Sequence, residues 1–150
     1  MTGVPADAAT GEASPAPAAP RVPGLLLGHA GFAAALLDVA TAIAGPVDDV
    51  PCLSNRGLSA DDLVAAITDQ VTRAGLPVVL LIDVAGGSCF NAARRATRGL
   101  AGAHLVAGVN LPLLLDFLQK RDRLPVDELV AHIVERGCSG ISNCRGGGGA

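Results

Sequence analysis

The run Val78–Ile82 is the feature of this sequence that most restricts its fold. Its five residues are all branched aliphatics, and Asp83 follows them directly. A strand with one face in water alternates apolar and polar residues, so a continuous apolar run is typical of a strand that is buried on both faces. The run therefore predicts a parallel sheet that is covered by helices on both sides.

Short apolar runs alternate with helical patterns along the rest of the chain. Besides 78–82, strands are expected at 24–28, 47–53 and 104–109. Apolar residues at helical spacing predict helices at 32–43, 63–74, about 89–98, 113–120 and 126–136. Gly137 is expected to end the last helix, and a short final strand is expected at 139–142. This alternation predicts an α/β fold, a doubly wound and mostly parallel sheet of about four strands with helices on both faces.

Length and the two ends of the chain set the expected domain organisation. At 150 residues, half of them hydrophobic, the chain is long enough for one domain with a proper core and too short for two. Residues 1–23 are largely Ala, Pro, Thr, Ser and Gly, so we expect a disordered leader there. Residues 145–150 include four consecutive glycines and predict a flexible tail. The folded domain is expected at 24–144.

Composition argues against several classes of partner. Three Phe without Trp or Tyr, and a net charge of −3, provide neither the stacking platform nor the basic surface of a nucleic-acid-binding protein. The longest uncharged stretches, 22–37 and 99–115, are too short to span a bilayer, and the N-terminus lacks a secretory signal. The four cysteines form no CxxC pair and no histidine stands near them in ligand spacing. We therefore expect a cytoplasmic protein with no metal and no cofactor.

Two ionisable residues stand at the carboxyl ends of expected strands. His29 follows the run at 24–28, and Asp83 ends the run at 78–82. Ligands bind outside the carboxyl ends of strands in an open parallel sheet, and these two strands are neighbours if the strand order is 2-1-3-4. A carboxylate that accepts the proton of one imidazole nitrogen leaves the other nitrogen free as a nucleophile or base. The pair is the predicted functional core; the alternative for each residue is a structural polar group.

Small residues surround both members of this pair. Gly31 stands close to His29, and Gly86 and Gly87 precede Ser88 at the start of the next helix. Glycine lets a ligand approach the backbone and Ser88 adds a hydroxyl donor, so a phosphate-sized pocket that uses these glycines is predicted. Glycines that only form turns are the ordinary alternative. Neither GxGxxG nor GxxxxGK[ST] occurs, which argues against a nucleotide site of these types.

Three blocks of sequence carry a family resemblance: LLLGHAGFA at 25–33, LIDVAGGSCFN at 81–91 and GVNLP at 108–112. In order and spacing they resemble the EIIA component of the mannose family of the bacterial phosphoenolpyruvate-dependent sugar phosphotransferase system. The likeness covers roughly residues 24–142. Two positions depart from the family pattern, because Ala30 interrupts its His-Gly pair and Cys89 replaces a proline. At a helix start, where a thiolate is favoured, Cys89 is either an oxidant sensor or an inert packed thiol.

The resemblance implies a phosphotransferase in sugar transport with a phosphohistidine intermediate on His29. It implies that the phosphocarrier HPr donates the phosphoryl group and a IIB component accepts it, while Asp83 orients the ring and Ser88 contacts phosphoryl oxygens. It also implies a homodimer, in which the last strand, here 139–142, is exchanged between subunits, and no direct membrane insertion. Two alternatives stay open: a regulatory sensor of phosphorylation state without a transport role, and an α/β domain that binds a small ligand without phosphoryl transfer.

Overall fold

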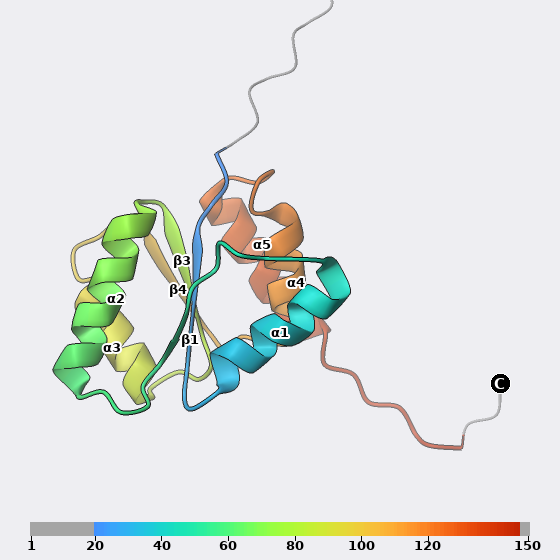
Figure 1. The fold of residues 1–150 in the computed structure, drawn as a ribbon. Coiled ribbons are helices and arrows are strands. Elements are labelled where there is room, and N and C mark those ends of the chain that lie inside the picture. Colours follow the sequence, from blue (N-terminus) through green and yellow to red (C-terminus); the bar gives the residue numbers. More distant parts are fainter. Residues whose placement is uncertain (1–19, 148–150) are drawn as a thin grey trace, which may run out of the picture.

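A four-stranded parallel sheet forms the middle layer of the protein (Figure 1). The computed structural model describes residues 20–147, so most of the expected leader and the end of the expected tail lie outside the described residues. The strands are β1 (Gly24–Gly28), β2 (Cys52–Ser54), β3 (Val78–Ile82) and β4 (Ala103–Ala107). Their order is β2-β1-β3-β4 and all pairs are parallel, which is the order that the pairing of His29 with Asp83 requires.

Helices cover both faces of this sheet (Figure 1). The helices on one face are α1 (Phe32–Ala44), α4 (Leu111–Lys120) and α5 (Val126–Ser139). On the other face lie α2 (Ala60–Ala74) and α3 (Ser88–Ala96). The α/β fold with helices on both faces is therefore confirmed. Within the described chain, no helix combines the length and the apolar character needed to cross a bilayer.

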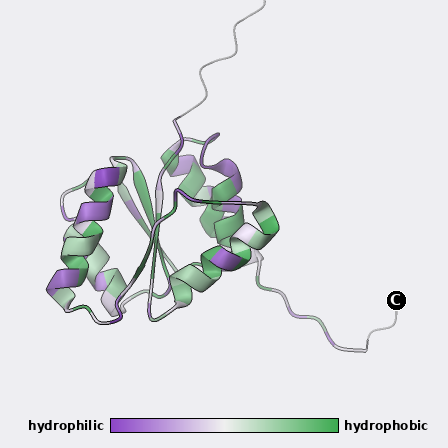
Figure 2. Ribbon diagram, in the orientation of Figure 1, coloured by the Kyte–Doolittle hydropathy of each residue, from purple (hydrophilic) through white to green (hydrophobic). Residues whose placement is uncertain are grey.

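Two hydrophobic cores, one on each side of the sheet, share the central strands. Leu26, Val79 and Leu81 belong to the core under α1, α4 and α5, whereas Leu80 and Ile82 belong to the core under α2 and α3. All residues of β3 are fully buried, because its side chains alternate between these two cores. Figure 2 shows the hydrophobic colour of the strands gathered in the middle of the molecule. The continuous apolar run has the double burial that its sequence predicts.

Helix α1 has the predicted position, and several of its large apolar residues are exposed. Its apolar residues at helical spacing include Phe32, Val39 and Ile43, which are 36%, 46% and 61% exposed. Ala33 and Ala40 are fully buried in the core, and Leu36 and Leu37 are half-buried and pack against it. Small side chains let the helix lie close to the sheet, while Phe32, Val39 and Ile43 are left toward solvent.

The end of α5 differs from the prediction. The helix continues through Gly137, which was expected to end it, and reaches Ser139. Gly137 is buried against Leu113, and its carbonyl accepts a hydrogen bond from Asn110 Nδ2 at 2.9 Å, so it serves close helix packing. Ser139 is therefore helical and no strand forms at 139–142 within this chain. The exchange of a strand between subunits stays a prediction.

Candidate functional site

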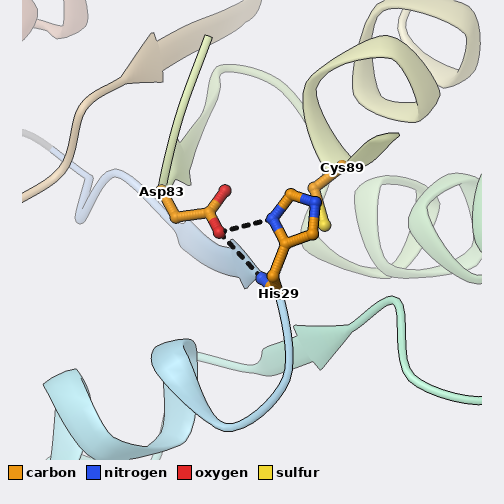
Figure 3. Close-up of side chains that lie close together, drawn as sticks. All are labelled: His29, Asp83 and Cys89. Atoms are coloured by element: carbon orange, nitrogen blue, oxygen red, sulfur yellow. Dashed lines mark hydrogen bonds and ion pairs between the residues drawn. The ribbon is translucent and has the colours of Figure 1, made fainter. Parts of the chain in front are cut away.

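The candidate site lies where β1 and β3 end side by side. Leu27 is in register with Ile82, so the residues just beyond the two strands share one edge of the sheet. His29 and Asp83 meet there (Figure 3). Asp83 Oδ2 lies 2.7 Å from His29 Nδ1 and also accepts the backbone N–H of His29 at 2.8 Å. The predicted pair is thus formed, and one carboxylate oxygen holds both the ring and the backbone of the histidine.

Asp83 is held in its charged form by its hydrogen bonds. Burial raises the pKa of this carboxyl, but the bonds from the His29 backbone and ring and from the Val84 backbone outweigh burial and bring the pKa below its usual value. The Val84 N–H donates to Oδ1 at 2.8 Å. A charged acceptor at Nδ1 favours the tautomer with the proton on Nδ1. The lone pair of Nε2 then points away from Asp83.

Ser88 and the start of α3 face this second ring nitrogen. Ser88 Oγ lies 3.2 Å from His29 Nε2. No side chain caps α3, and its N-cap is Gly87, so backbone N–H groups of its first turn have no partner within the helix. Such a helix start favours a negatively charged group through these N–H groups and the helix dipole. A phosphoryl group on Nε2 would face both the hydroxyl and the helix start.

The predicted glycines have different positions in the site. Gly86 has a φ of +80°, which glycine adopts without strain, and it forms the turn before α3. A Cβ on Gly87 would lie 2.9 Å from His29 Cε1, so a side chain there would push the ring away. Gly31 is the N-cap of α1, and a Cβ there would meet nothing within 4 Å. Phosphate binding by these three glycines stays a prediction.

Asn55, just after β2, is a residue of the site that the sequence did not reveal. Its Nδ2 donates to Ser88 Oγ at 3.2 Å, and its Oδ1 accepts the backbone N–H of Ala30 at 3.4 Å. The same parallel-strand rule that pairs His29 with Asp83 could have found it, because β2 ends at the same edge as β1. The strand expected at 47–53 is weak in its apolar pattern, and the observed β2 begins five residues later and ends one residue later.

A hollow of about 340 Å³ opens beside Ser88, between α2 and α3. Its lining residues are Asn55, Leu58, Ser59, Ala60, Leu63, Ser88, Asn91, Ala92 and Arg95. The hollow is therefore lined by Ser88, which contacts Nε2 of His29, and by Asn55, which contacts Ser88. The hollow therefore adjoins the site on the side of Ser88.

Cys89 lies beside the pair but is not exposed. It is 1% exposed, and its Sγ and the ligating atoms of His29 and Asp83 lie within 4.8 Å of one another (Figure 3). Burial and the negative charge of Asp83 raise the pKa of the Cys89 thiol, despite hydrogen bonds that lower it. A thiol must lose its proton to bind a metal, and both Asp83 oxygens already accept hydrogen bonds. The cluster therefore fits a packed thiol beside a His–Asp pair better than a metal centre.

Comparisons with known proteins identify the family of the chain. The EIIA-man family, described as "PTS system fructose IIA component", matches residues 25–134. The mannose-specific EIIAB component of Escherichia coli K12 is 35% identical over 122 residues, which cover 78% of this chain and 38% of that protein. The chain thus spans less than two fifths of that relative. The sorbose-specific EIIA component of Lacticaseibacillus casei is 29% identical over 117 residues, which cover 74% of this chain and 82% of that protein.

Solved structures show the same fold. The EIIA component from Streptococcus agalactiae superposes with a TM-score of 0.76 at 23% identity, over 81% of this chain and 96% of that one. A mannose/sorbose-specific IIA subunit from Enterococcus faecalis gives a TM-score of 0.74 at 23% identity, over 83% and 96%. At these identities the likeness concerns the fold.

Proposed function

The chain belongs to the EIIA-man family, and from this membership and the geometry around His29 we propose that it is a phosphocarrier of a sugar phosphotransferase system. It accepts a phosphoryl group from the phosphocarrier HPr on His29 and passes it to a IIB component. The observation that carries the proposal is the 2.7 Å contact between Asp83 Oδ2 and His29 Nδ1. This contact leaves Nε2 as the free nucleophile, on the side of Ser88 and the start of α3.

The transfer step follows from this arrangement. The donor arrives as a phosphohistidine whose ring carries a proton on its other nitrogen. The lone pair of His29 Nε2 attacks phosphorus, the N–P bond of the donor breaks, and its electron pair returns to the donor ring. The positive charge then resides on the His29 ring, where the Asp83 carboxylate stabilises it through Nδ1–H. No proton enters or leaves, so the step needs positioning and charge stabilisation only.

Ser88 and the first turn of α3 stabilise the phosphoryl group in this scheme. Negative charge on the phosphoryl oxygens develops next to the Ser88 hydroxyl and free backbone N–H groups, which are already oriented before the reaction. Gly86 and Gly87 allow this close approach, and Gly31, two residues after His29, is proposed to provide backbone to the phosphoryl group as well. Asp83 is the orienting residue, and His29 is the phosphoryl acceptor.

Membership of the family also supports an expected assembly and location. We expect a homodimer that acts in the cytoplasm, where its donor and acceptor proteins meet it. Sedimentation of the purified protein measures the assembly directly. A mass of one chain of 14.9 kDa would contradict the dimer.

Onward transfer tests the carrier role against a sensor role. The purified protein is phosphorylated, separated from its donors and mixed with a IIB component of a mannose-family system, and the phosphoryl group on each protein is followed with time. A carrier loses its label to the IIB component within seconds, and Ser88→Ala slows this loss. Retention of the label, in the presence of a IIB component that accepts it from another IIA, would contradict the carrier role.

A further inference from the structure

We propose that Asn55 is a positioning residue that fixes the direction of the Ser88 hydroxyl, and so directs its hydrogen toward Nε2 of His29 and the phosphoryl group bound there. The inference rests on the proposed phosphoryl transfer at His29. It adds a residue from β2 to a site otherwise formed after β1 and β3. Asn55 is half-buried, and its contacts join the end of β2 to both His29's neighbour Ala30 and the start of α3.

The orientation of the Asn55 amide follows from its contact with Ala30. A backbone N–H can only donate, so the atom that faces Ala30 N at 3.4 Å must be the amide oxygen, Oδ1. Nδ2 then faces Ser88 Oγ at 3.2 Å, and an amide nitrogen can only donate. Ser88 Oγ is therefore an acceptor toward Asn55.

The orientation of Ser88 follows in turn. A hydroxyl carries one hydrogen, and its oxygen already accepts from Asn55, so the hydrogen is available to His29 Nε2 at 3.2 Å. Nε2 can accept it because Asp83 favours the proton on Nδ1. The four side chains then form a directed chain of donors, from Asn55 through Ser88 and His29 to Asp83.

Phosphorylation keeps the hydrogen bond from Asn55 to Ser88 but changes the acceptor of the Ser88 hydrogen. A phosphoryl group on Nε2 uses the lone pair that accepted the hydrogen bond from Ser88. The Ser88 hydroxyl then donates to a phosphoryl oxygen instead. Asn55 continues to donate to Ser88 Oγ, so the hydroxyl stays a donor in the transfer step. Without Asn55 the hydroxyl is free to rotate and to donate elsewhere, and part of the stabilisation of the phosphoryl charge is lost.

An isosteric exchange separates this role from packing. Asn55→Asp keeps the size of the side chain but replaces the donor by an acceptor, which takes the Ser88 hydrogen and adds a negative charge. Loss of one oriented donor lowers rates by about 100-fold in comparable sites. We therefore expect a loss of about 100-fold in the rate of His29 phosphorylation for Asn55→Asp and a smaller loss, about 10-fold, for Asn55→Ala, at unchanged donor concentration. Circular dichroism checks that both variants are folded.

A double-mutant cycle tests whether Asn55 acts through Ser88. In the Ser88→Ala background there is no hydroxyl to orient. There, Asn55→Ala should lower the rate of His29 phosphorylation by less than a further factor of about two. Full additivity of the two losses, or equal rates for wild type and Asn55→Asp, would overturn the inference while the carrier function stands. The control Asn143→Asp makes the same amide-to-carboxylate change at an exposed position and should leave the rate unchanged.

The hydrogen-bond chain has a readout that needs no phosphorylation. Nitrogen-15 NMR of the His29 ring distinguishes a hydrogen-bonded Nε2 acceptor from a free one. We expect Nε2 to shift toward the free value by the same amount in Asn55→Asp and Ser88→Ala, while Nδ1 keeps its proton. An unchanged Nε2 signal in Asn55→Asp would overturn the inference, whether or not HPr phosphorylates the protein. A wild type that HPr does not phosphorylate would contradict only the proposed function.

Discussion

Asp83 Oδ2 binds His29 twice, at the ring Nδ1 and at the backbone N–H, at 2.7 and 2.8 Å. One oxygen of Asp83 therefore holds both the imidazole ring and the backbone at the end of β1. The orientation of the ring is thus coupled to the register of β1 with β3. A neutral amide could not make all of these contacts, because Asp83 Oδ1 also accepts the Val84 N–H and the nitrogen of an amide cannot accept.

Asp83→Asn should slow phosphorylation of His29 with little effect on its final extent. The amide places either an oxygen or a donor at Nδ1, and no negative charge remains to stabilise the ring cation. From comparable His–carboxylate pairs we expect a loss of about 100-fold or more in the single-turnover rate. Rapid-quench measurement with phosphorylated HPr in excess gives this rate. A rate within about twofold of wild type would show that Asp83 does not orient the nucleophile.

Acid should remove a part of the stability that Asp83 supplies. Its pKa is lower in the folded protein than the unfolded value of 3.8, so its contribution is complete above that value and is lost as pH falls through the folded pKa. The free energy of unfolding of wild type and Asp83→Asn should therefore converge below about pH 4, where the carboxylate becomes protonated. Urea unfolding at neutral and acid pH measures the difference. A constant difference across this range would contradict the lowered pKa.

Gly87→Ala should impair the site more than the fold. The new methyl would lie 2.9 Å from His29 Cε1, and the ring is the part of that contact that can move. We expect the free energy of unfolding to change by less than about 1 kcal/mol, because Gly87 is only half-buried and the ring can move aside, while the phosphorylation rate falls at least about tenfold. Gly31→Ala is the matched stability control, since its methyl meets nothing within 4 Å. A large loss of stability in Gly87→Ala alone would indicate that the loop, not the ring, yields.

Much of the site was predictable because a parallel sheet brings the ends of neighbouring strands together. The strong run at 78–82 located Asp83, and the short run at 24–28 located His29, and their strands pair in register. Asn55 was missed because β2 has only three half-buried residues and gives a weak apolar signal. Apolar spacing alone did not reveal which of these ends would reach the histidine.

The helices show where sequence periodicity stops being informative. The apolar residues Val39 and Ile43 of α1 helped to predict the helix, but they are 46% and 61% exposed, and the fully buried residues of the helix are alanines. Gly137 looked like a helix end, but its lack of a side chain is used to pack α5 against Leu113. In both cases the burial of a residue depended on how closely its helix approaches the neighbouring element. The local sequence does not contain that distance.

Asp49→Asn should destabilise the protein away from the site. Asp49 is paired with Arg121, which is 4% exposed, so the exchange leaves a buried guanidinium without its counter-charge. An unpaired buried polar group costs about 1–3 kcal/mol, and we expect that loss in the free energy of unfolding. Urea unfolding measures it, and Asp48→Asn, an exposed neighbour, is the control. Equal stability of the two variants would show that the Arg121 pair contributes nothing.

The most direct test of the phosphocarrier function is the mass of the protein after incubation with phosphoenolpyruvate, enzyme I and HPr. Wild type should gain one phosphoryl group that is labile in acid and stable in base, as a phosphohistidine is, and His29→Ala should gain none. Equal labelling of His29→Ala would contradict the assignment of His29. No labelling of wild type, by donor proteins that phosphorylate another EIIA, would contradict phosphoryl transfer by this protein.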